Sequence, residues 1–200
     1  MHIILDIDGT LISEDTPSTL ARPHLHEFLK FCFEKFETVS IWSAAGEDHV
    51  KCVSEAILPE GKNWLFVKHS KHCHCRYTGG FGGYPLIITQ KRLWKVWRSK
   101  KYRNLGIKKE NTLIIDNTPK VCVKNYGNAI YVQTFRGEDS DDELLKLMEY
   151  LTAVLYCQNV RKLEKRGWRS IVEGKLRSYR PFEKSYCIYC ENTGSCLACH

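Results

Sequence analysis

The sequence contains no long apolar run. None of its segments approaches the roughly 20 consecutive apolar residues that a membrane-spanning helix needs. We also expect no secretory leader, because the first strand-like segment begins at residue 2 and reaches two aspartates at once. We therefore expect an intracellular protein of the cytoplasm or nucleus, with no membrane partner. No internal repeat is present, and the 200 residues are enough for one sizeable domain and a tail.

Acidic residues are scarce in two segments. Residues 91–109 hold nine Lys or Arg and no acid, and residues 158–200 hold nine Lys or Arg against four Glu, which gives that segment a charge of +5. The whole chain carries +7. This asymmetry favours a polyanionic or phosphorylated partner, so the basic segments could also associate with nucleic acid or a polymerase. The alternative is that each run is a solvated helix face.

The ten cysteines include four at the extreme end of the chain, in two CxxC pairs. Four thiolates in this pattern can hold a structural Zn²⁺ ion in a tetrahedral site. The residues concerned are Cys187, Cys190, Cys196 and Cys199. Two other interpretations stay open. One is a tail whose thiols stay free, and the other is haem attachment through the CxxCH pattern, which would need an export route and a second axial ligand.

Strand-like and helix-like segments alternate along the chain. The expected strands are 2–7, 38–42, 64–67, 111–116 and 128–132, and the expected helices are 22–36, 47–58, 91–102 and 140–157. Ser140 and Glu143 have the spacing of a capping box at the start of the last helix. The alternation predicts an α/β fold in which a parallel sheet carries helices on both faces.

Polar residues end three of the expected strands. Asp6 and Asp8 end the first strand, Ser43 follows the second, and Asp116 and Asn117 end the strand near 112–115. In such sheets ligands bind at the carboxyl ends of the strands. Each residue alone would be ordinary, as a helix cap or part of a turn. Together they predict one site at one edge of the sheet.

These residue types suit phosphoryl transfer. A carboxylate can attack phosphorus and form an acyl-phosphate, and a second carboxyl can protonate the leaving oxygen and then activate water. We assign the first role to Asp6 and the second to Asp8, with the Ser43 hydroxyl as a donor to the phosphoryl oxygens. Because clustered carboxylates repel a phosphate, a Mg²⁺ ion is expected, and its oxygen ligands would come from Asp6, the Asp8 carbonyl, Asn117 and Asp116.

The order of these motifs resembles the haloacid dehalogenase (HAD) superfamily of aspartate-based phosphatases. Within it, the motifs are most similar to those of the RNA polymerase II C-terminal-domain phosphatases and the NLI-interacting-factor-like small phosphatases. The segments that carry the resemblance, over roughly residues 2–165, are DIDGT, ARPHLHEFL, SIWSAA, KRLWKVW and LIIDNTP. It places the family's phosphate-binding lysine at Lys91, with Lys95 one helical turn away as the alternative. Gly9 stands where this group usually has Glu.

The resemblance implies a HAD-like, Rossmannoid sheet. The intervals from Asp6 to Ser43 and from Ser43 to Lys91 are too short for a large cap domain, and leave room only for a small hairpin or loop insertion at 68–88. A site without a lid suits a phosphorylated protein segment. The His- and Cys-rich stretch 69–75 could bind a metal, but its spacing favours an exposed loop.

We predict three segments: a HAD-like phosphatase domain at 1–160, a basic helical or linker segment at 161–186, and a Cys-rich tail at 187–200. The predicted function is a Mg²⁺-dependent phosphatase that forms an aspartyl-phosphate and acts on phosphoserine or phosphothreonine in proteins, with the RNA polymerase II C-terminal-domain repeat as one candidate. Two alternatives stay open. One is a HAD phosphatase for nucleic-acid ends or small phosphorylated metabolites, and the other is a binding protein that acts through its basic, Cys-rich tail. A compact member of this kind would fit a large DNA virus.

Overall fold

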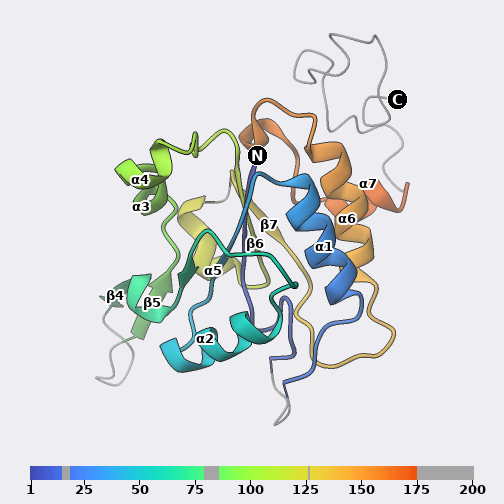
Figure 1. The fold of residues 1–200 in the computed structure, drawn as a ribbon, viewed down its shortest axis with the longest axis horizontal. Helices are drawn as coiled ribbons and strands as arrows, with labels where there is room; N and C mark the ends of the chain where they lie inside the picture. The colour runs from blue at the N-terminus through green and yellow to red at the C-terminus, as the bar shows by residue number, and fades with distance from the viewer. Residues whose placement is uncertain (15–18, 79–85, 126, 175–200) are drawn as a thin grey trace.

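A parallel sheet of five strands forms the centre of the molecule (Figure 1). The computed structural model describes residues 1–14, 19–78, 86–125 and 127–174. The strand order is β3-β2-β1-β6-β7, which places β1 in the middle of the sheet. The strands are β1 (His2–Leu5), β2 (Thr38–Trp42), β3 (Val67–Lys68), β6 (Thr112–Asp116) and β7 (Ala129–Tyr131). The α/β fold predicted from the sequence is confirmed.

Helices cover both faces of this sheet. In Figure 1, α1, α6 and α7 lie on one side of the strands, and α3 and α4 lie on the other. Buried residues of α2 belong to the same apolar cluster as those of α1 and α6, whereas α5 shares the opposite cluster with α3. The helices are α1 (Leu25–Lys35), α2 (Glu47–Ala56), α3 (Trp94–Trp97), α4 (Lys100–Arg103), α5 (Pro119–Cys122), α6 (Glu143–Val154) and α7 (Trp168–Val172).

Alternate side chains of the strands enter two apolar clusters. Ile3 and Leu5 lie in the larger cluster with Phe28 of α1, whereas Ile4 lies in the smaller cluster with Leu93. Successive side chains of a strand point to opposite faces of the sheet. A strand that is covered on both faces is therefore apolar throughout, which explains the unbroken run from Ile3 to Leu5.

The insertion at 68–88 contains a short 3-10 helix and an antiparallel hairpin. The 3-10 helix η1 (Ser70–His72) precedes β4 (His74–Thr78), which pairs with β5 (Leu86–Gln90). The predicted small insertion is thus a hairpin. Because β5 ends one residue before Lys91, the returning strand of the hairpin leads directly to that lysine.

The prediction of one helix over 91–102 is wrong. The structure has two short helices, α3 and α4, separated at Ser99, whose backbone is extended with a ψ of 124°. After Trp97, which packs against the smaller cluster, the sequence RSKK offers no apolar residue, so packing does not sustain a longer helix there. Beyond the break, the ring of Tyr102 lies against that of Phe66, with 5.2 Å between centroids.

The third strand also begins later than predicted, at Val67 instead of residue 64. Trp64 belongs to the preceding connection, where its ring lies 5.1 Å from that of Phe33 and its indole N–H donates to the Ser54 carbonyl at 3.0 Å. A tertiary contact of the large side chain therefore overrides the local strand propensity.

The capping box expected at Ser140 and Glu143 does not form. α6 begins at Glu143, and Asp141 Oδ1 accepts the Glu143 N–H at 3.1 Å. The Glu143 carboxylate instead accepts the Gln133 N–H at 2.6 Å and pairs with Arg169 of α7. Glu143 thus joins α6 to α7 and to the chain that follows β7.

The packed core extends beyond residue 160. Leu163 is buried, and Trp168 is completely buried in the larger cluster, where its indole N–H donates to the Tyr131 carbonyl of β7 at 2.9 Å. The segment that follows residue 160, where the sequence analysis placed the end of the phosphatase domain, thus covers the edge of the sheet. The Cys-rich segment 187–200 lies outside the described residues. In the part of the chain that the structure describes, no helix is long and apolar enough to cross a membrane.

Candidate active site

The carboxyl ends of β1 and β6 bring two predicted carboxylates together. The two strands pair in parallel, with Leu5 opposite Ile115, so the residues that follow, Asp6 and Asp116, lie side by side. The Asp6 N–H donates to the Ile115 carbonyl at 3.0 Å, which extends the ladder to the site. β1 also pairs with β2, which ends just before Ser43. The predicted convergence at one edge of the sheet is therefore present.

Lys91 joins the two carboxylates. Its Nζ donates to Asp6 Oδ1 and, at 2.7 Å, to Asp116 Oδ2. The three residues are almost removed from solvent, with exposed fractions of 1% for Lys91, 5% for Asp6 and 0% for Asp116. The Lys91 N–H is held by the Val121 carbonyl at 2.8 Å, so the end of the hairpin is fixed against α5.

Lys95, the alternative lysine, lies elsewhere. Its Nζ donates to the carbonyls of His72 and Cys73, at 2.9 Å and 3.4 Å. It therefore fastens the start of the hairpin and does not contact the carboxylates. Of the two lysines that the sequence offers, the structure brings Lys91 to Asp6.

Burial shapes the acidity of this cluster. It raises the pKa of the Asp6 carboxyl to about 7, an effect that the charge of Lys91 opposes and that of Asp116 increases. For Lys91, burial favours a lower pKa, but the two neighbouring carboxylates outweigh it and raise the pKa above its ordinary value. With both carboxylates ionised, the cluster carries one uncompensated negative charge.

Asp8 lies nearer to solvent and is held from two sides. Ser43 Oγ donates to Asp8 Oδ2 at 3.1 Å and accepts the Ala45 N–H at 3.0 Å. On the other side, His49 Nε2 lies 2.7 Å from Asp8 Oδ1. The Asp8 side chain is 31% exposed, so this carboxyl, unlike that of Asp6, can exchange protons with a substrate or with water.

Two residues of the site were missed by the sequence analysis. Thr10 is fully buried and its Oγ1 donates to Asp6 Oδ2 at 3.1 Å. Its membership of the DIDGT motif was a signal that could have identified it. His49 comes from the first turn of α2. The signal for His49 was weaker: the helix that follows Ser43 must start at the edge of the sheet where ligands bind.

Gly9 permits a close approach between β1 and the loop after β6. Its φ is +70°, and a Cβ at this position would lie 2.3 Å from Asn117 Nδ2. The Asn117 amide is also fixed by Thr134, which accepts from Nδ2 at 3.1 Å, and by Thr118, which donates to Oδ1 at 3.1 Å. Any side chain at Gly9 would therefore displace the Asn117 amide.

The donor set at this edge fits a hard divalent cation. Two carboxylates, the Asn117 amide oxygen and the Asp8 carbonyl are ligand types that Mg²⁺ prefers, and Mg²⁺ commonly takes only one or two carboxylates beside waters and phosphate oxygens. The uncompensated charge of the cluster would also attract a cation. Within the described residues, no group of three or more His, Cys, Asp and Glu side chains could hold a metal ion, so the amide and carbonyl oxygens would be needed.

Two other segments were considered for metal binding. The four tail cysteines lie outside the described residues. In the insertion, His72 Nδ1 accepts the His69 N–H at 3.3 Å, and the two rings make a T-shaped contact. This nitrogen of His72 is therefore occupied by a backbone group.

Comparison with known proteins gives the family. The model of the NLI interacting factor-like phosphatase family matches residues 1–161. This chain belongs to that family. The match covers the carboxylate cluster, the hairpin and the sheet, and it confirms the resemblance that the ordered motifs suggested.

The individual relatives of this chain share less than a third of their residues with it. The ubiquitin-like domain-containing CTD phosphatase 1 of Xenopus tropicalis is 28% identical over 177 residues, which are 83% of this chain and 53% of the relative. The human protein of the same name is 28% identical over 184 residues, 86% of this chain and 55% of the relative. The chain thus spans about half the length of these curated relatives. A crystal structure of an uncharacterized protein from Listeria monocytogenes serotype 4b shares the fold, with a TM-score of 0.50, 15% identity, and coverage of 77% of this chain and 97% of that one.

Proposed function

We propose that this chain is a Mg²⁺-dependent phosphatase that acts on phosphoserine or phosphothreonine in proteins through an aspartyl-phosphate intermediate. The observation that carries the proposal is the joining of Asp6 and Asp116 by Lys91 at the carboxyl edge of the sheet, beside a more exposed Asp8. The cluster combines a buried carboxylate, an ammonium and an accessible carboxyl within one site.

The first chemical step uses both carboxyl groups of the DIDGT motif. An oxygen of Asp6 attacks phosphorus and forms a P–O bond, while the bond from phosphorus to the serine or threonine oxygen breaks. Asp8 gives its proton to that leaving oxygen. The products are the free hydroxyl of the substrate and a phosphorylated Asp6.

The second step reverses the role of Asp8. It accepts a proton from a water molecule, whose oxygen attacks phosphorus and displaces the Asp6 oxygen. Inorganic phosphate leaves and the Asp6 carboxylate is restored. The hydrogen bond from Ser43 and the contact with His49 hold Asp8 in place for both transfers.

Positive charge near the phosphoryl group comes from two sources. Lys91 neutralises part of the cluster and can donate to a phosphoryl oxygen. When bound, Mg²⁺ would supply the remaining charge compensation, held by Asp6, Asn117, Asp116 and the Asp8 carbonyl. The raised pKa of Asp6 supports a role for the metal ion. Because Asp6 must be ionised to act as a nucleophile and Lys91 alone does not offset its burial, a bound cation would stabilise the negative charge of the Asp6 carboxylate.

The substrate class is proposed from three facts. The curated relatives are named CTD phosphatases. In the described parts of the intervals from Asp8 to Ser43 and from Ser43 to Lys91, the structure contains α1, α2, the 3-10 helix η1, short strands and the hairpin, and no cap domain. The segment 91–109 carries nine Lys or Arg and no acid. It begins in the site with Lys91 and ends before β6 at the opposite edge of the sheet, and its charge favours a phosphorylated partner.

A panel of phosphorylated substrates tests this proposal. Phosphoserine and phosphothreonine peptides, DNA ends phosphorylated at the 3′ or 5′ position, and sugar phosphates should be compared with and without Mg²⁺, using Asp6→Asn as the inactive control. We expect Mg²⁺-dependent phosphate release that is fastest on the peptides. Preference for DNA ends or sugar phosphates would replace the substrate class, and full activity of Asp6→Asn would refute the mechanism.

A further inference from the structure

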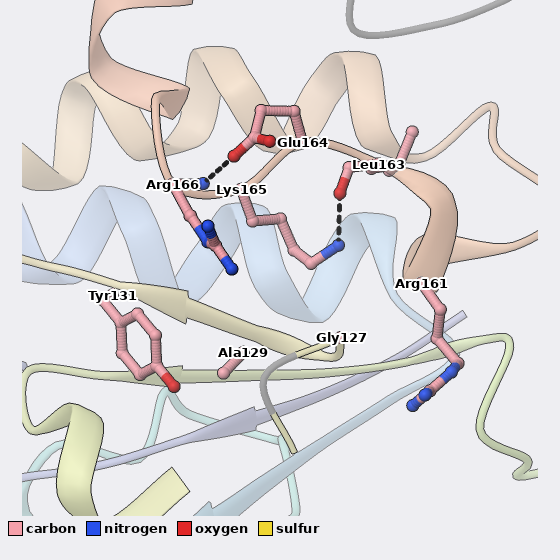
Figure 2. Close-up of a pocket in the computed structure, with 8 residues that line it drawn as sticks. All are labelled: Gly127, Ala129, Tyr131, Arg161, Leu163, Glu164, Lys165 and Arg166. Atoms are coloured by element: carbon pink, nitrogen blue, oxygen red, sulfur yellow. Dashed lines mark hydrogen bonds between the residues drawn. The ribbon is translucent and has the colours of Figure 1, made fainter. Parts of the chain in front are cut away.

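A second polar cavity lies along β7, at the edge of the sheet. Its volume is about 290 Å³, and it lies, open to solvent, between β7 and the segment that crosses it (Figure 2). None of its lining residues belongs to the carboxylate cluster or contacts it through a hydrogen bond that the structure describes. The residues that line it are Gly127, Ala129, Tyr131, Arg161, Leu163, Glu164, Lys165 and Arg166.

Three cations line this cavity without a carboxylate partner. Among the described residues, no Asp or Glu lies within ion-pair distance of Arg161, Lys165 or Arg166. Lys165 is only 6% exposed, and its ammonium donates to the backbone carbonyls of Val160 and Leu163. Burial lowers the pKa of Lys165 to about 8, so its positive charge is undercompensated where it lies.

The one acidic residue of the lining offsets these charges only in part, because the charge of Glu164 raises the pKa of Lys165 by less than burial lowers it. Glu164 Oε1 accepts the N–H groups of Arg166 and Gly167. Figure 2 shows the Glu164 side chain folding back over its own segment and Arg166 extending toward β7, whereas the Lys165 ammonium turns to the Leu163 carbonyl. The cavity is therefore electropositive, with Ala129, Leu163 and the Tyr131 ring as its apolar wall.

Arg161 is held in place by its neighbours. Its Nη1 donates to Asn128 Oδ1 at 2.6 Å. A Cβ at Gly127 would lie 3.2 Å from the Arg161 guanidinium carbon, so the absence of a side chain there leaves room for the guanidinium to lie against the backbone. A fixed guanidinium presents planar N–H donors, which match the oxygens of a phosphate.

We propose that this cavity binds the phosphate group of a small phosphorylated ligand or phosphorylated side chain, at a site separate from the candidate active site. Arg161, Lys165 and Arg166 would surround the phosphate oxygens, and the Tyr131 ring would cover the organic part of the ligand. The volume is near the lower end of the roughly 300–1,000 Å³ typical of small-ligand pockets, so a single phosphorylated group suits it better than a duplex.

A local binding measurement on the full chain tests this site. Inorganic phosphate should be titrated at constant ionic strength while the amide resonances of Gly127 and Ala129 are followed by NMR. We expect saturable shifts, weakened about fivefold or more in Arg166→Gln and abolished in the Arg161→Gln, Arg166→Gln double variant. Lys162→Gln, which removes a neighbouring charge outside the cavity, should retain the affinity of the parent chain.

Three results would overturn the site: shifts that chloride reproduces, shifts that do not saturate, or equal affinities for the parent and Arg166→Gln. Arg166 is exposed and the structure gives its side chain no hydrogen bond, so this variant should fold, which unchanged resonances of the α1 core would verify. Titration of the Asp6→Asn variant with O-phosphoserine, a phosphoserine peptide and AMP then shows whether the site binds a phosphorylated side chain or a small phosphorylated ligand more tightly. The measurement does not depend on catalysis, so its failure is separate from failure of the proposed function.

Discussion

Asp6 and Asp8 are separated by one residue but lie in different environments. Asp6 is 5% exposed and bonded to Lys91 and Thr10, whereas the Asp8 side chain is 31% exposed and bonded to Ser43. Two carboxyl groups in unlike environments can act in unlike roles. This difference supports the proposed division into nucleophile and acid/base, which rests on position more than on residue type.

Gly9 provides a test at the scale of one residue. Gly9→Ala places a Cβ against Asn117 in a backbone with φ of +70°, so we expect a loss of about 1–3 kcal/mol in the free energy of unfolding and weaker Mg²⁺ binding. Gly61→Ala is the matched control, because Gly61 has φ of +68° and nothing within 4 Å of the added Cβ. Denaturant unfolding and Mg²⁺ titration measure both effects. Equal Mg²⁺ affinities in the two variants would contradict this role of Gly9.

His49 should act as a positioning residue for Asp8. His49→Leu removes the contact at 2.7 Å, and we expect kcat to fall roughly three- to tenfold with little change in KM, because the contact orients a group used in the chemical steps. His49→Gln, which retains a side-chain donor, should recover most of the rate. His26→Leu on α1, exposed and outside the site, is the control. An unchanged kcat in His49→Leu would exclude the role.

Lys165 predicts a pH dependence of stability. Its folded pKa is about 8, below the unfolded value near 10.5, so above pH 8 the folded chain loses this proton before the unfolded chain does. Stability should therefore rise with pH between 8 and 10.5, relative to Lys165→Met, by up to about 1.4 kcal/mol per pH unit. Urea unfolding of both proteins at several pH values measures the difference. Parallel curves would show that Lys165 titrates normally.

At the scale of elements, the hairpin positions a residue of the site, whereas the last helix packs against the core. β5 leads to Lys91 and so places it beside the carboxylates. The chain before the hairpin is held by the hydrogen bond from Lys95 to the His72 carbonyl, and the chain after it by the hydrogen bond from the Lys91 N–H to the Val121 carbonyl. α7 instead closes the far edge of the sheet through Trp168. The site therefore depends on a short insertion, and the core depends on a segment beyond residue 160.

Removal of Trp168 tests the extent of the domain. Trp168→Ala should lower the free energy of unfolding by about 3–5 kcal/mol, because the indole is completely buried and bonded to Tyr131. Trp94→Ala, at a tryptophan that is 43% exposed, should cost much less. A fragment ending at residue 160 should be less stable still than Trp168→Ala. Thermal unfolding of the three proteins measures these differences, and a stable 1–160 fragment would support the boundary predicted from the sequence.

Local sequence patterns predicted the elements that are buried on two faces. The strands β1 and β6 contain continuous apolar runs, Ile3–Leu5 and Leu113–Ile115, and α1 has apolar residues at helical spacing, so these elements were evident from the sequence. The break at Ser99 and the late start of β3 were not, because they depend on tertiary contacts of Tyr102 and Trp64. Local propensity is a weak guide where such contacts compete with it.

The candidate site was predictable for a related reason. Parallel strands must end at a common edge, so Asp6, Ser43 and Asp116 could be grouped from their order alone. The contact between His49 and Asp8 depends on how α2 is rotated against the sheet, which sequence spacing does not fix. The cavity beside β7 forms between segments more than 30 residues apart, so no local pattern indicated it.

At the scale of the whole molecule, two regions of opposite character lie on one sheet. The carboxylate cluster at the end of β1 joins two carboxylates to one ammonium, and the cavity along β7 is lined by three cations. The net charge of the whole chain, +7, favours the approach of phosphorylated ligands. We propose that the sheet carries a site for chemistry in the first region and a separate site for binding in the second.

The central claim is that Asp6 forms a covalent bond to phosphorus. The full chain should be mixed with Mg²⁺ and a phosphopeptide in a single turnover, quenched rapidly, and reduced with borohydride, which converts an aspartyl-phosphate to homoserine. Mass spectrometry of the digested chain should then find homoserine at position 6, and none in Asp6→Asn or without the phosphopeptide. Homoserine at another carboxylate, or phosphate release at the full rate by Asp6→Asn, would contradict the account.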